Sequence, residues 1–337
     1  MLKKIILFSF VYLMSLASQN IKLLNWWDFI APNVVNDIKK NKNNLLLTTY
    51  KSNDVAISKI ITSSHNLDIA ILSNQVIPSL IEANLIHKNI FKNKYNFAKM
   101  YSFLSSFNES CIPYSWSTTL FISNRAEKVK IKQLTDFNTD SFSSINLAVI
   151  DDKMEFLARL VGDNIKTCPK QPNNVMGCSL DYITKIPLKV SSNKFTSSIA
   201  DILSLKNSVV FGWSGEGAGL LKNHNSIEFV MPQGLPVIGY DSICIIKNKN
   251  SRKKQADLVK FAIELSSEKN ALENSKYMQY FSPYKNNFEV LHPKTKELLI
   301  DILRKIEIET PIIISAPNRS NHEVINSWWK KIRYVKK

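Results

Sequence analysis

Short apolar runs that alternate with helix-like segments constrain the fold of this chain most strongly. In the first part of the chain, strand-like runs are expected at 21–24, 45–49 and 67–72, and helices at 32–41, 54–63 and 76–83. Each strand is followed by a helix. This order predicts a largely parallel sheet that helices cover on both faces.

The same pattern restarts in the second half. Strands are expected at 145–150, 209–211 and 242–246, and helices at 152–161 and 254–266. The length of 337 residues suits two domains or one two-lobed unit. We therefore expect two α/β lobes. Ligands of such sheets bind beyond the carboxyl ends of strands, and four side chains directly follow predicted strands: Trp26, Ser73, Asp152 and Trp213.

Residues 1–18 have the features of a secretory signal peptide. Lys3 and Lys4 precede an apolar run at 5–16, and small residues follow, so cleavage is expected near Ala17 or Ser18. The alternatives are an N-terminal membrane anchor and a buried first strand. No later segment reaches the roughly 18–20 apolar residues that span a bilayer. The mature protein is expected to be soluble and periplasmic.

The chain has four cysteines, and the first is Cys111, so lipid attachment at a cysteine beside the cleavage site is excluded. Cys168 and Cys178 bracket a loop rich in Pro and Asn, which in an oxidising compartment favours a disulfide over two free thiols. Cys111 and Cys244 lie in apolar strand-like runs. They are expected to be small, buried and unpaired.

The sequence lacks several well-known catalytic motifs. The run Gly212–Glu216 (GWSGE) resembles a hydrolase nucleophile elbow but has Glu216 where the motif requires glycine. Glycine-rich phosphate loops and the helical zinc-protease motif are also missing, and the five histidines are dispersed. We expect no catalytic residues, no metal and no cofactor, with a secreted enzyme of unrecognised site as the alternative.

The formal net charge of +16 could suit a nucleic acid or an anionic lipid. The lysines are scattered along the chain, however, and form no basic stripe interleaved with aromatic residues. No nucleic-acid partner is expected.

Asp152 and Glu155 open a predicted helix. Residues three apart lie on one helix face, so both carboxylates could point to one ligand. The same spacing is that of a capping box, in which the two side chains only cap the helix. The local sequence alone favours the cap.

Six segments, taken in order, resemble motifs of bacterial periplasmic spermidine/putrescine-binding proteins, the receptors of polyamine ABC importers. They are 25–30 (NWWDFI), 50–54 (YKSND), 68–73 (DIAILS), 112–119 (IPYSWSTT), 151–155 (DDKME) and 240–242 (YDS). The resemblance implies a two-lobed type II periplasmic binding protein fold with a ligand cleft between the lobes. Lobe 1 would comprise 19–118 and 240–288, and lobe 2 would comprise 119–239 and 289–337.

The resemblance also implies a site. Side chains that would line the cleft are Trp26, Asp28, Phe29, Ser73, Trp213 and Tyr280, and the carboxylates that would pair with ligand nitrogens are Asp152, Glu155 and Asp241. The implied function is capture of putrescine or spermidine by a monomeric protein, without catalysis, for delivery to the membrane permease of an ABC transporter. Alternatives are the same fold with another solute, and a ligand sensor that docks through the segment 328–331. For this segment the sequence favours an amphipathic helix that packs Val324, Ile325 and Trp328 on its own lobe.

The chain departs from the family pattern at several positions. Gly239 and Gln75 stand where the family usually has aromatic residues, and Phe29 replaces a tyrosine. Trp27 stands where a small polar residue is usual. The carboxylates are therefore retained better than the rings, which supports a cationic ligand more strongly than a particular ligand length.

Overall fold

The computed structural model describes residues 20–40, 44–124, 131–138, 145–168, 180–186, 188, 195–196, 199–248, 251–315 and 321–333. The predicted signal peptide and Cys178 lie outside these described residues. Among the helices within them, none combines the length and apolar character that a bilayer crossing requires.

The first part of the chain folds as predicted. Its elements are β1 (Ile21–Trp26), α2 (Pro32–Lys40), β2 (Leu45–Tyr50), α3 (Asn53–Ser63), η2 (Ser64–Asn66), β3 (Ile69–Ser73) and α4 (Ile77–Glu82). β1 pairs in parallel with both β2 and β3. Ser52 caps α3 by accepting a hydrogen bond from the backbone N–H of Val55, as serine commonly does at a helix start.

The middle of the chain contains η3 (Ser102–Phe107), β4 (Cys111–Asn124), η4 (Leu134–Asn138), β5 (Asn146–Ile150), α5 (Lys153–Asn164), α6 (Leu180–Ile183), β6 (Phe195–Thr196), α7 (Ile199–Leu203), β7 (Ser208–Trp213), α8 (Ser214–Leu220) and β8 (Ile227–Val230). The last part contains β9 (Val237–Ile245), α9 (Ser251–Leu265), α10 (Glu268–Met278), α11 (Pro293–Ile308), β10 (Ile312–Ile313) and α12 (His322–Arg333).

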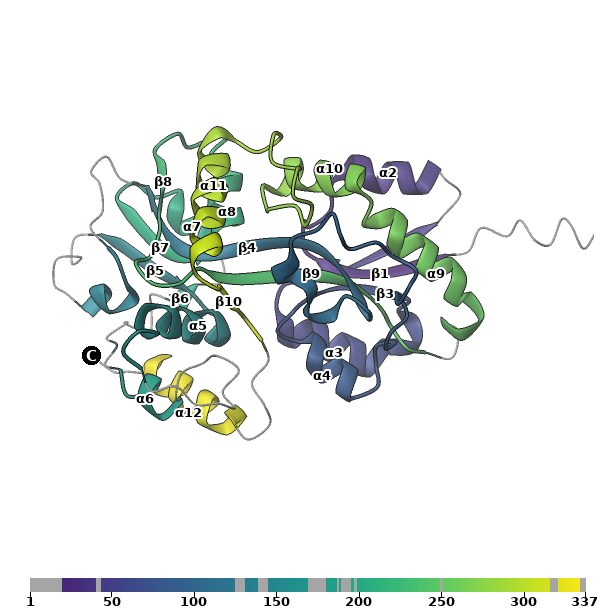
Figure 1. Cartoon of the computed structure of the whole chain (residues 1–337), viewed down its shortest axis with the longest axis horizontal. Helices are drawn as coiled ribbons and strands as arrows, with labels where there is room; N and C mark the ends of the chain where they lie inside the picture. Colours follow the sequence, from purple (N-terminus) through teal and green to yellow (C-terminus); the bar gives the residue numbers. More distant parts are fainter. Residues whose placement is uncertain are drawn as a thin grey trace, which may run out of the picture.

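Two long strands, β4 and β9, connect the two halves of the molecule (Figure 1). They pair with each other antiparallel, and β9 also pairs antiparallel with β3, as β4 does with β7. The strand order is β2-β1-β3-β9-β4-β7-β5-β6. The predicted parallel sheet is present among β1, β2 and β3 and among β5, β6 and β7. The prediction is wrong for the centre of the sheet, where β9 runs antiparallel to β3 and β4, and β4 runs antiparallel to β7.

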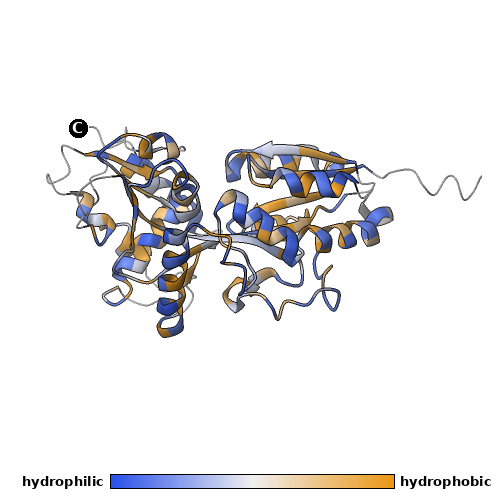
Figure 2. Cartoon of the chain, turned by 90° about the horizontal axis from the view of Figure 1, so that it is seen from above, coloured by the Kyte–Doolittle hydropathy of each residue, from blue (hydrophilic) through white to orange (hydrophobic). Residues whose placement is uncertain are grey.

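Seen from above, two lobes are joined by a narrow waist (Figure 2). Separate cores stabilise them: Phe121, Phe156 and Phe211 belong to the core of one lobe, and Phe91 and Phe261 to a core of the other. The predicted lobe boundaries near 118 and 239 fall inside β4 and β9, and they remain a prediction. The α/β, two-lobed fold class itself is confirmed.

The C-terminal helix α12 packs on its own lobe. Trp328 and Trp329 are buried, with ring centroids 6.3 and 5.6 Å from that of Phe156 in α5. At its end, Arg333 forms an ion pair with Asp151, next to the start of α5. The two tryptophans are therefore part of the core. The predicted packing of this helix on its own lobe is confirmed for Ile325 and Trp328, whereas Val324 is exposed. This burial does not favour the alternative of a free docking element.

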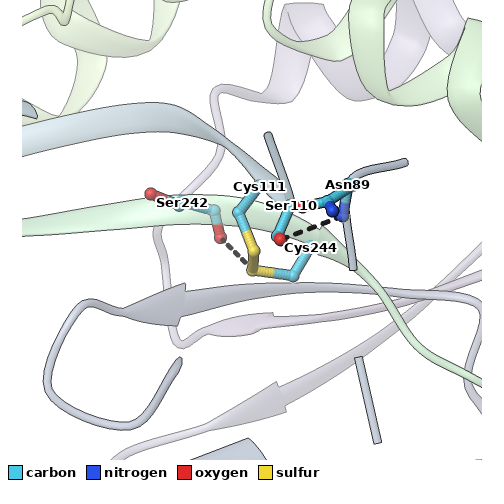
Figure 3. The surroundings of a disulfide bond; sticks show 5 residues. All are labelled: Asn89, Ser110, Cys111, Ser242 and Cys244. Carbon is cyan, nitrogen blue, oxygen red and sulfur yellow. Dashed lines mark hydrogen bonds between the residues drawn. A yellow bond between two sulfur atoms is a disulfide. The ribbon is translucent and has the colours of Figure 1, made fainter. Parts of the chain in front are cut away.

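A disulfide joins Cys111 of β4 to Cys244 of β9, so the prediction that these two cysteines are unpaired is wrong (Figure 3). The two residues are direct partners across the antiparallel ladder, with Cα atoms 4.5 Å apart, which is the closer type of cross-strand pair. Both are fully buried. The apolar sequence around the two cysteines correctly predicts that both are buried. Their pairing with each other depends on the register between β4 and β9, which cannot be read from the sequence.

Cys168 is also disulfide-bonded, and no cysteine among the described residues is free. Its predicted partner, Cys178, lies outside the described residues, so that pairing stays a prediction.

Candidate ligand-binding site

Three of the predicted site residues end strands. Trp26, Ser73 and Trp213 are the last residues of β1, β3 and β7. Asp241 lies inside β9, directly opposite Ser73 in the antiparallel ladder. The strand ends and the crossing strand therefore place these side chains near the waist between the lobes.

Among the described residues, Asp241 is hydrogen-bonded by a tryptophan and forms no ion pair. The indole Nε1 of Trp26 donates a hydrogen bond of 2.8 Å to Asp241 Oδ1. The Trp26 ring in turn packs on Tyr50, with ring centroids 4.4 Å apart. Burial raises the pKa of Asp241 to about 7, and the bond from Trp26 partly opposes that rise. A carboxylate that is desolvated in this way gains strongly from a cationic partner.

Asp152 and Glu155 lie at the start of α5 in the other lobe, and their roles differ. Asp152 is the N-cap, and its Oδ1 accepts from the backbone N–H groups of Met154 and Glu155 at 2.9 and 3.1 Å. The Glu155 carboxylate instead accepts from Trp213 Nε1 at 3.0 Å. The capping interpretation is thus right for Asp152, whereas Glu155 faces the candidate site.

Glu155 is buried, and its Oε2 has no hydrogen-bond partner among the described residues. Burial, followed by the negative charge of Asp152, raises its pKa well above the ordinary value, and Asp241 adds to the rise. Burial also raises the pKa of Asp152. Desolvated carboxyl groups brought close together make a site prepared for a cation.

Aromatic rings surround these carboxylates. The rings of Phe29 and Tyr280 meet edge to face, with centroids 4.8 Å apart. Tyr280 also packs on Gly215 so closely that a Cβ at this position would overlap its ring. Burial raises the pKa of Tyr280, and the nearby charges of Glu216, Asp241 and Glu155 contribute in that order. Tyr280 therefore lies within electrostatic reach of carboxylates from both lobes.

Asp28 is placed differently from the other candidates. It is exposed, has a φ of 55°, and its carboxylate accepts a hydrogen bond from Tyr277. The neighbouring Trp27 has 64% of its surface exposed, and Lys51 Nζ lies 5.2 Å from its ring centroid. Asp28 therefore lies apart from the buried carboxylates, and its place in the cleft lining stays a prediction.

Two polar residues near the site were missed. The amide of Gln75, considered only as a lost aromatic ring, donates from Nε2 to Glu155 Oε1 at 3.4 Å. Glu216, considered only as a mismatch to a hydrolase motif, is a desolvated carboxyl whose pKa burial raises to about 7. A possible signal for Glu216 was its place three residues after Trp213, at the carboxyl end of a strand.

Gly239 leaves space for Glu155. A Cβ at position 239 would stand 3.0 Å from Glu155 Oε1, which is tighter than most real contacts. The ring that the family usually carries here would therefore need the glutamate to move. Within the described part of the chain, no group of three or more His, Cys, Asp or Glu side chains could hold a metal ion.

The raised pKa values predict a definite pH dependence. Burial raises the pKa of Asp241 and of Glu216 to about 7, whereas carboxyls in an unfolded chain titrate near pH 4. Between about pH 4 and pH 7 the folded, ligand-free protein thus binds more protons than the unfolded chain. Its stability should fall as pH rises through this window. Thermal melts of the ligand-free protein across this range check the expectation.

A cationic ligand should reverse this trend, because it pairs with the ionised carboxylates. The rise in Tm that such a ligand produces should grow with pH over the same window. Binding near neutral pH should also release protons. Calorimetry in buffers of different ionisation enthalpy would reveal this release, and a binding enthalpy that does not depend on the buffer would contradict it.

Comparisons with known proteins agree with the fold and with part of the sequence-based interpretation. No family model matches the chain. A putrescine/agmatine-binding protein of Pseudomonas aeruginosa is 23% identical over 264 residues, which cover 69% of this chain and 70% of that protein.

Solved structures give wider coverage. The spermidine/putrescine ABC transporter substrate-binding protein of Streptococcus pneumoniae superposes with a TM-score of 0.71 at 19% identity, covering 94% of this chain and 100% of that one. The TpPotD lipoprotein of Treponema pallidum gives a TM-score of 0.70 at 14% identity, covering 94% and 100%. A maltose-bound protein of T. maritima also matches, with a TM-score of 0.66, 10% identity and coverage of 94% and 95%. The chain has the two-lobed type II periplasmic binding protein fold of these structures. The similarity to the putrescine/agmatine-binding protein agrees with the resemblance seen in the sequence motifs.

Proposed function

We propose that this protein captures a polyamine, such as putrescine or spermidine, outside the cytoplasm and delivers it to the permease of an ABC importer. The observation that carries the proposal is a pair of desolvated carboxylates, Glu155 and Asp241. Each accepts a hydrogen bond from a tryptophan N–H, and neither forms an ion pair within the described part of the chain. The relative from Pseudomonas aeruginosa, named for putrescine and agmatine, supports the same ligand class.

The chemistry of a polyamine matches this arrangement. Each ammonium group carries several donors and a charge, which an ionised carboxylate satisfies best. A ring face near the cation contributes about 0.5–2 kcal/mol, and each buried methylene about 0.8 kcal/mol. In this proposal Asp241 and Glu155 bind nitrogens, and Asp152 supports Glu155 from the helix start. The other lining side chains are Trp26, Phe29, Ser73, Trp213 and Tyr280.

An anionic ligand fits poorly. Anion sites in proteins use helix N-termini and cationic donors, whereas the N-terminus of α5 is already capped by the carboxylate of Asp152. Glu155 and Asp241 would repel an anion that approached the same position. The basic net charge disfavours long-range attraction of a polycation, but salt screens such attraction beyond about 8–10 Å.

The test is a calorimetric titration of the purified protein with putrescine, spermidine and, as a zwitterion, γ-aminobutyrate. Saturable binding of a diamine or triamine, with γ-aminobutyrate much weaker, is expected. Tight binding of the zwitterion with no heat from either polyamine would refute the proposal.

Glu155→Gln separates ligand binding from helix capping. The amide keeps the size of the side chain and can still accept from Trp213, but it removes the charge. Polyamine affinity should fall by about tenfold or more, while Tm of the ligand-free protein stays constant or rises, because a desolvated carboxyl is removed. A lower Tm with unchanged polyamine affinity would assign Glu155 to the helix alone.

The extracytoplasmic location is supported by the buried Cys111–Cys244 disulfide, because such bonds persist in oxidising compartments. A periplasmic protein should have lost its first residues. Mass spectrometry of the protein from the periplasmic fraction is expected to find a new N-terminus near Ala17 or Ser18. An intact Met1 in that fraction would show that the signal peptide is not removed.

A further inference from the structure

Gln75 bridges the two lobes at the candidate site. It follows β3 closely and is buried, with 9% of its surface exposed. Its Oε1 accepts a hydrogen bond of 3.3 Å from Asn53 Nδ2 at the start of α3. Its Nε2 donates to Glu155 Oε1 in the other lobe, and a bond from the same side chain partly opposes the rise that burial causes in the pKa of Asp152. Gln75 is thus a neutral donor placed among negative charges.

The Gln75 amide makes the two oxygens of Glu155 unequal. Oε1 accepts from both Trp213 Nε1 and Gln75 Nε2. It also lies against Gly239, where even a Cβ would stand only 3.0 Å away. Oε2 is equally buried but has no partner in the part of the chain that the structure describes. One oxygen of this carboxylate therefore accepts two hydrogen bonds, whereas the other is buried without one and is the acceptor left for a ligand. The Thr119 hydroxyl also lies near the carboxylate and opposes the rise in its pKa.

This inequality distinguishes two kinds of cation. A guanidinium is planar and pairs best with a carboxylate through two parallel N–H···O bonds, which require both oxygens. An ammonium group is a compact charge with three rotatable donors and needs only one oxygen. We propose that Gln75 makes the Glu155 end of the site selective for a primary ammonium over a guanidinium. This inference rests on the proposed function, because it concerns the same site.

A suitable probe must present a guanidinium to Glu155. Agmatine is ambiguous, since it has one amino group and one guanidinium and can turn around in the site. Diguanidinobutane has the same alkyl chain as putrescine with a guanidinium at each end. It therefore presents a guanidinium to Glu155 in either orientation. The measured quantity is the ratio of the two dissociation constants, obtained by calorimetry or by competition.

The wild-type protein should bind putrescine at least about tenfold more tightly than diguanidinobutane, as expected for the loss of one good charge-assisted bond. Gln75→Ala removes one of the two donors to Glu155 Oε1 and opens the space beside it, while Trp213 still donates to this oxygen. The ratio should then fall by about tenfold, mainly because the diguanidine binds better. Equal affinities in the wild type, or an unchanged ratio in Gln75→Ala, would overturn the inference.

Asn53→Ala is the matched control. It removes the bond to Gln75 Oε1 but leaves the amide donor that faces the carboxylates. The ratio should stay within about twofold of the wild type. If this variant lowers the ratio as much as Gln75→Ala does, loosened packing explains the effect and the inference falls. Gln75→Ser replaces Gln75→Ala if the alanine variant does not fold.

Different results would refute the proposed function and the role of Gln75. A wild-type protein that binds neither probe contradicts the proposed function and the inference together. A wild-type protein that binds putrescine without discriminating against the diguanidine leaves the proposed function in place and removes only the assigned role of Gln75.

Discussion

Asp241→Asn is expected to weaken polyamine binding more than a hundredfold. The asparagine keeps the shape of the side chain and an oxygen that can accept from Trp26 Nε1, so the local packing is preserved. It removes the charge that pairs with a desolvated ammonium. Removing one partner of a buried charge pair costs about 3–5 kcal/mol, and 1.4 kcal/mol corresponds to about tenfold in affinity.

Calorimetry with putrescine and spermidine measures the effect, and thermal melts verify the fold. The matched control is Asp54→Asn, which removes an exposed carboxylate near the start of α3 in the same lobe. Exposed charges contribute little, about 0–1 kcal/mol, so this variant should bind nearly as the wild type does. Affinity that is equal in Asp241→Asn and Asp54→Asn would remove Asp241 from the site.

The second large effect concerns stability. Replacing Cys111 and Cys244 together by alanine is expected to lower the free energy of unfolding by about 3–5 kcal/mol. The two cysteines are separated by 133 positions in the sequence, so the bond closes a long loop. The conformational entropy that a cross-link removes from the unfolded chain grows with the length of the loop. The bond also lies between the two strands that connect the lobes, β4 and β9.

Denaturant unfolding of the double variant and of the oxidised wild type measures this difference. Peptide mapping after alkylation provides the independent check. Without reduction, neither Cys111 nor Cys244 should be alkylated even in the denatured protein, and after reduction both should be. Alkylation of Cys111 in unreduced, denatured protein would show that the bond does not form.

The candidate site could be predicted in part from the sequence. Trp26, Ser73 and Trp213 were found because hydrophobic periodicity locates strands, and the carboxyl ends of strands are where ligands bind in such sheets. Asp241 could be assigned only by resemblance. It lies within β9, where no turn or strand end distinguishes it from any other strand residue.

The roles of neighbouring residues required the tertiary structure. A capping box and a ligand-binding pair have the same spacing, so the sequence could not separate the functions of Asp152 and Glu155. The structure separates them because Trp213, 58 positions away in the chain, donates to Glu155 rather than leaving it to the helix end. The places of Gln75 and Glu216 near the site could not be predicted for the same reason. They depend on contacts with residues of other elements, such as Glu155 for Gln75 and Ile199 for Glu216.

The sequence by itself determined the elements of the first β-α-β-α-β unit, several strands and helices of the second half, and the two α/β lobes, because these follow from local periodicity and from the turns between elements. Only the tertiary structure decided which strands pair and in which direction. The antiparallel contact of β4 with β9 turned two apparently unpaired cysteines into a disulfide. It also turned part of an expected parallel sheet into a mixed one. Register and burial are set by contacts between residues far apart in the chain, and a single sequence records such contacts only indirectly.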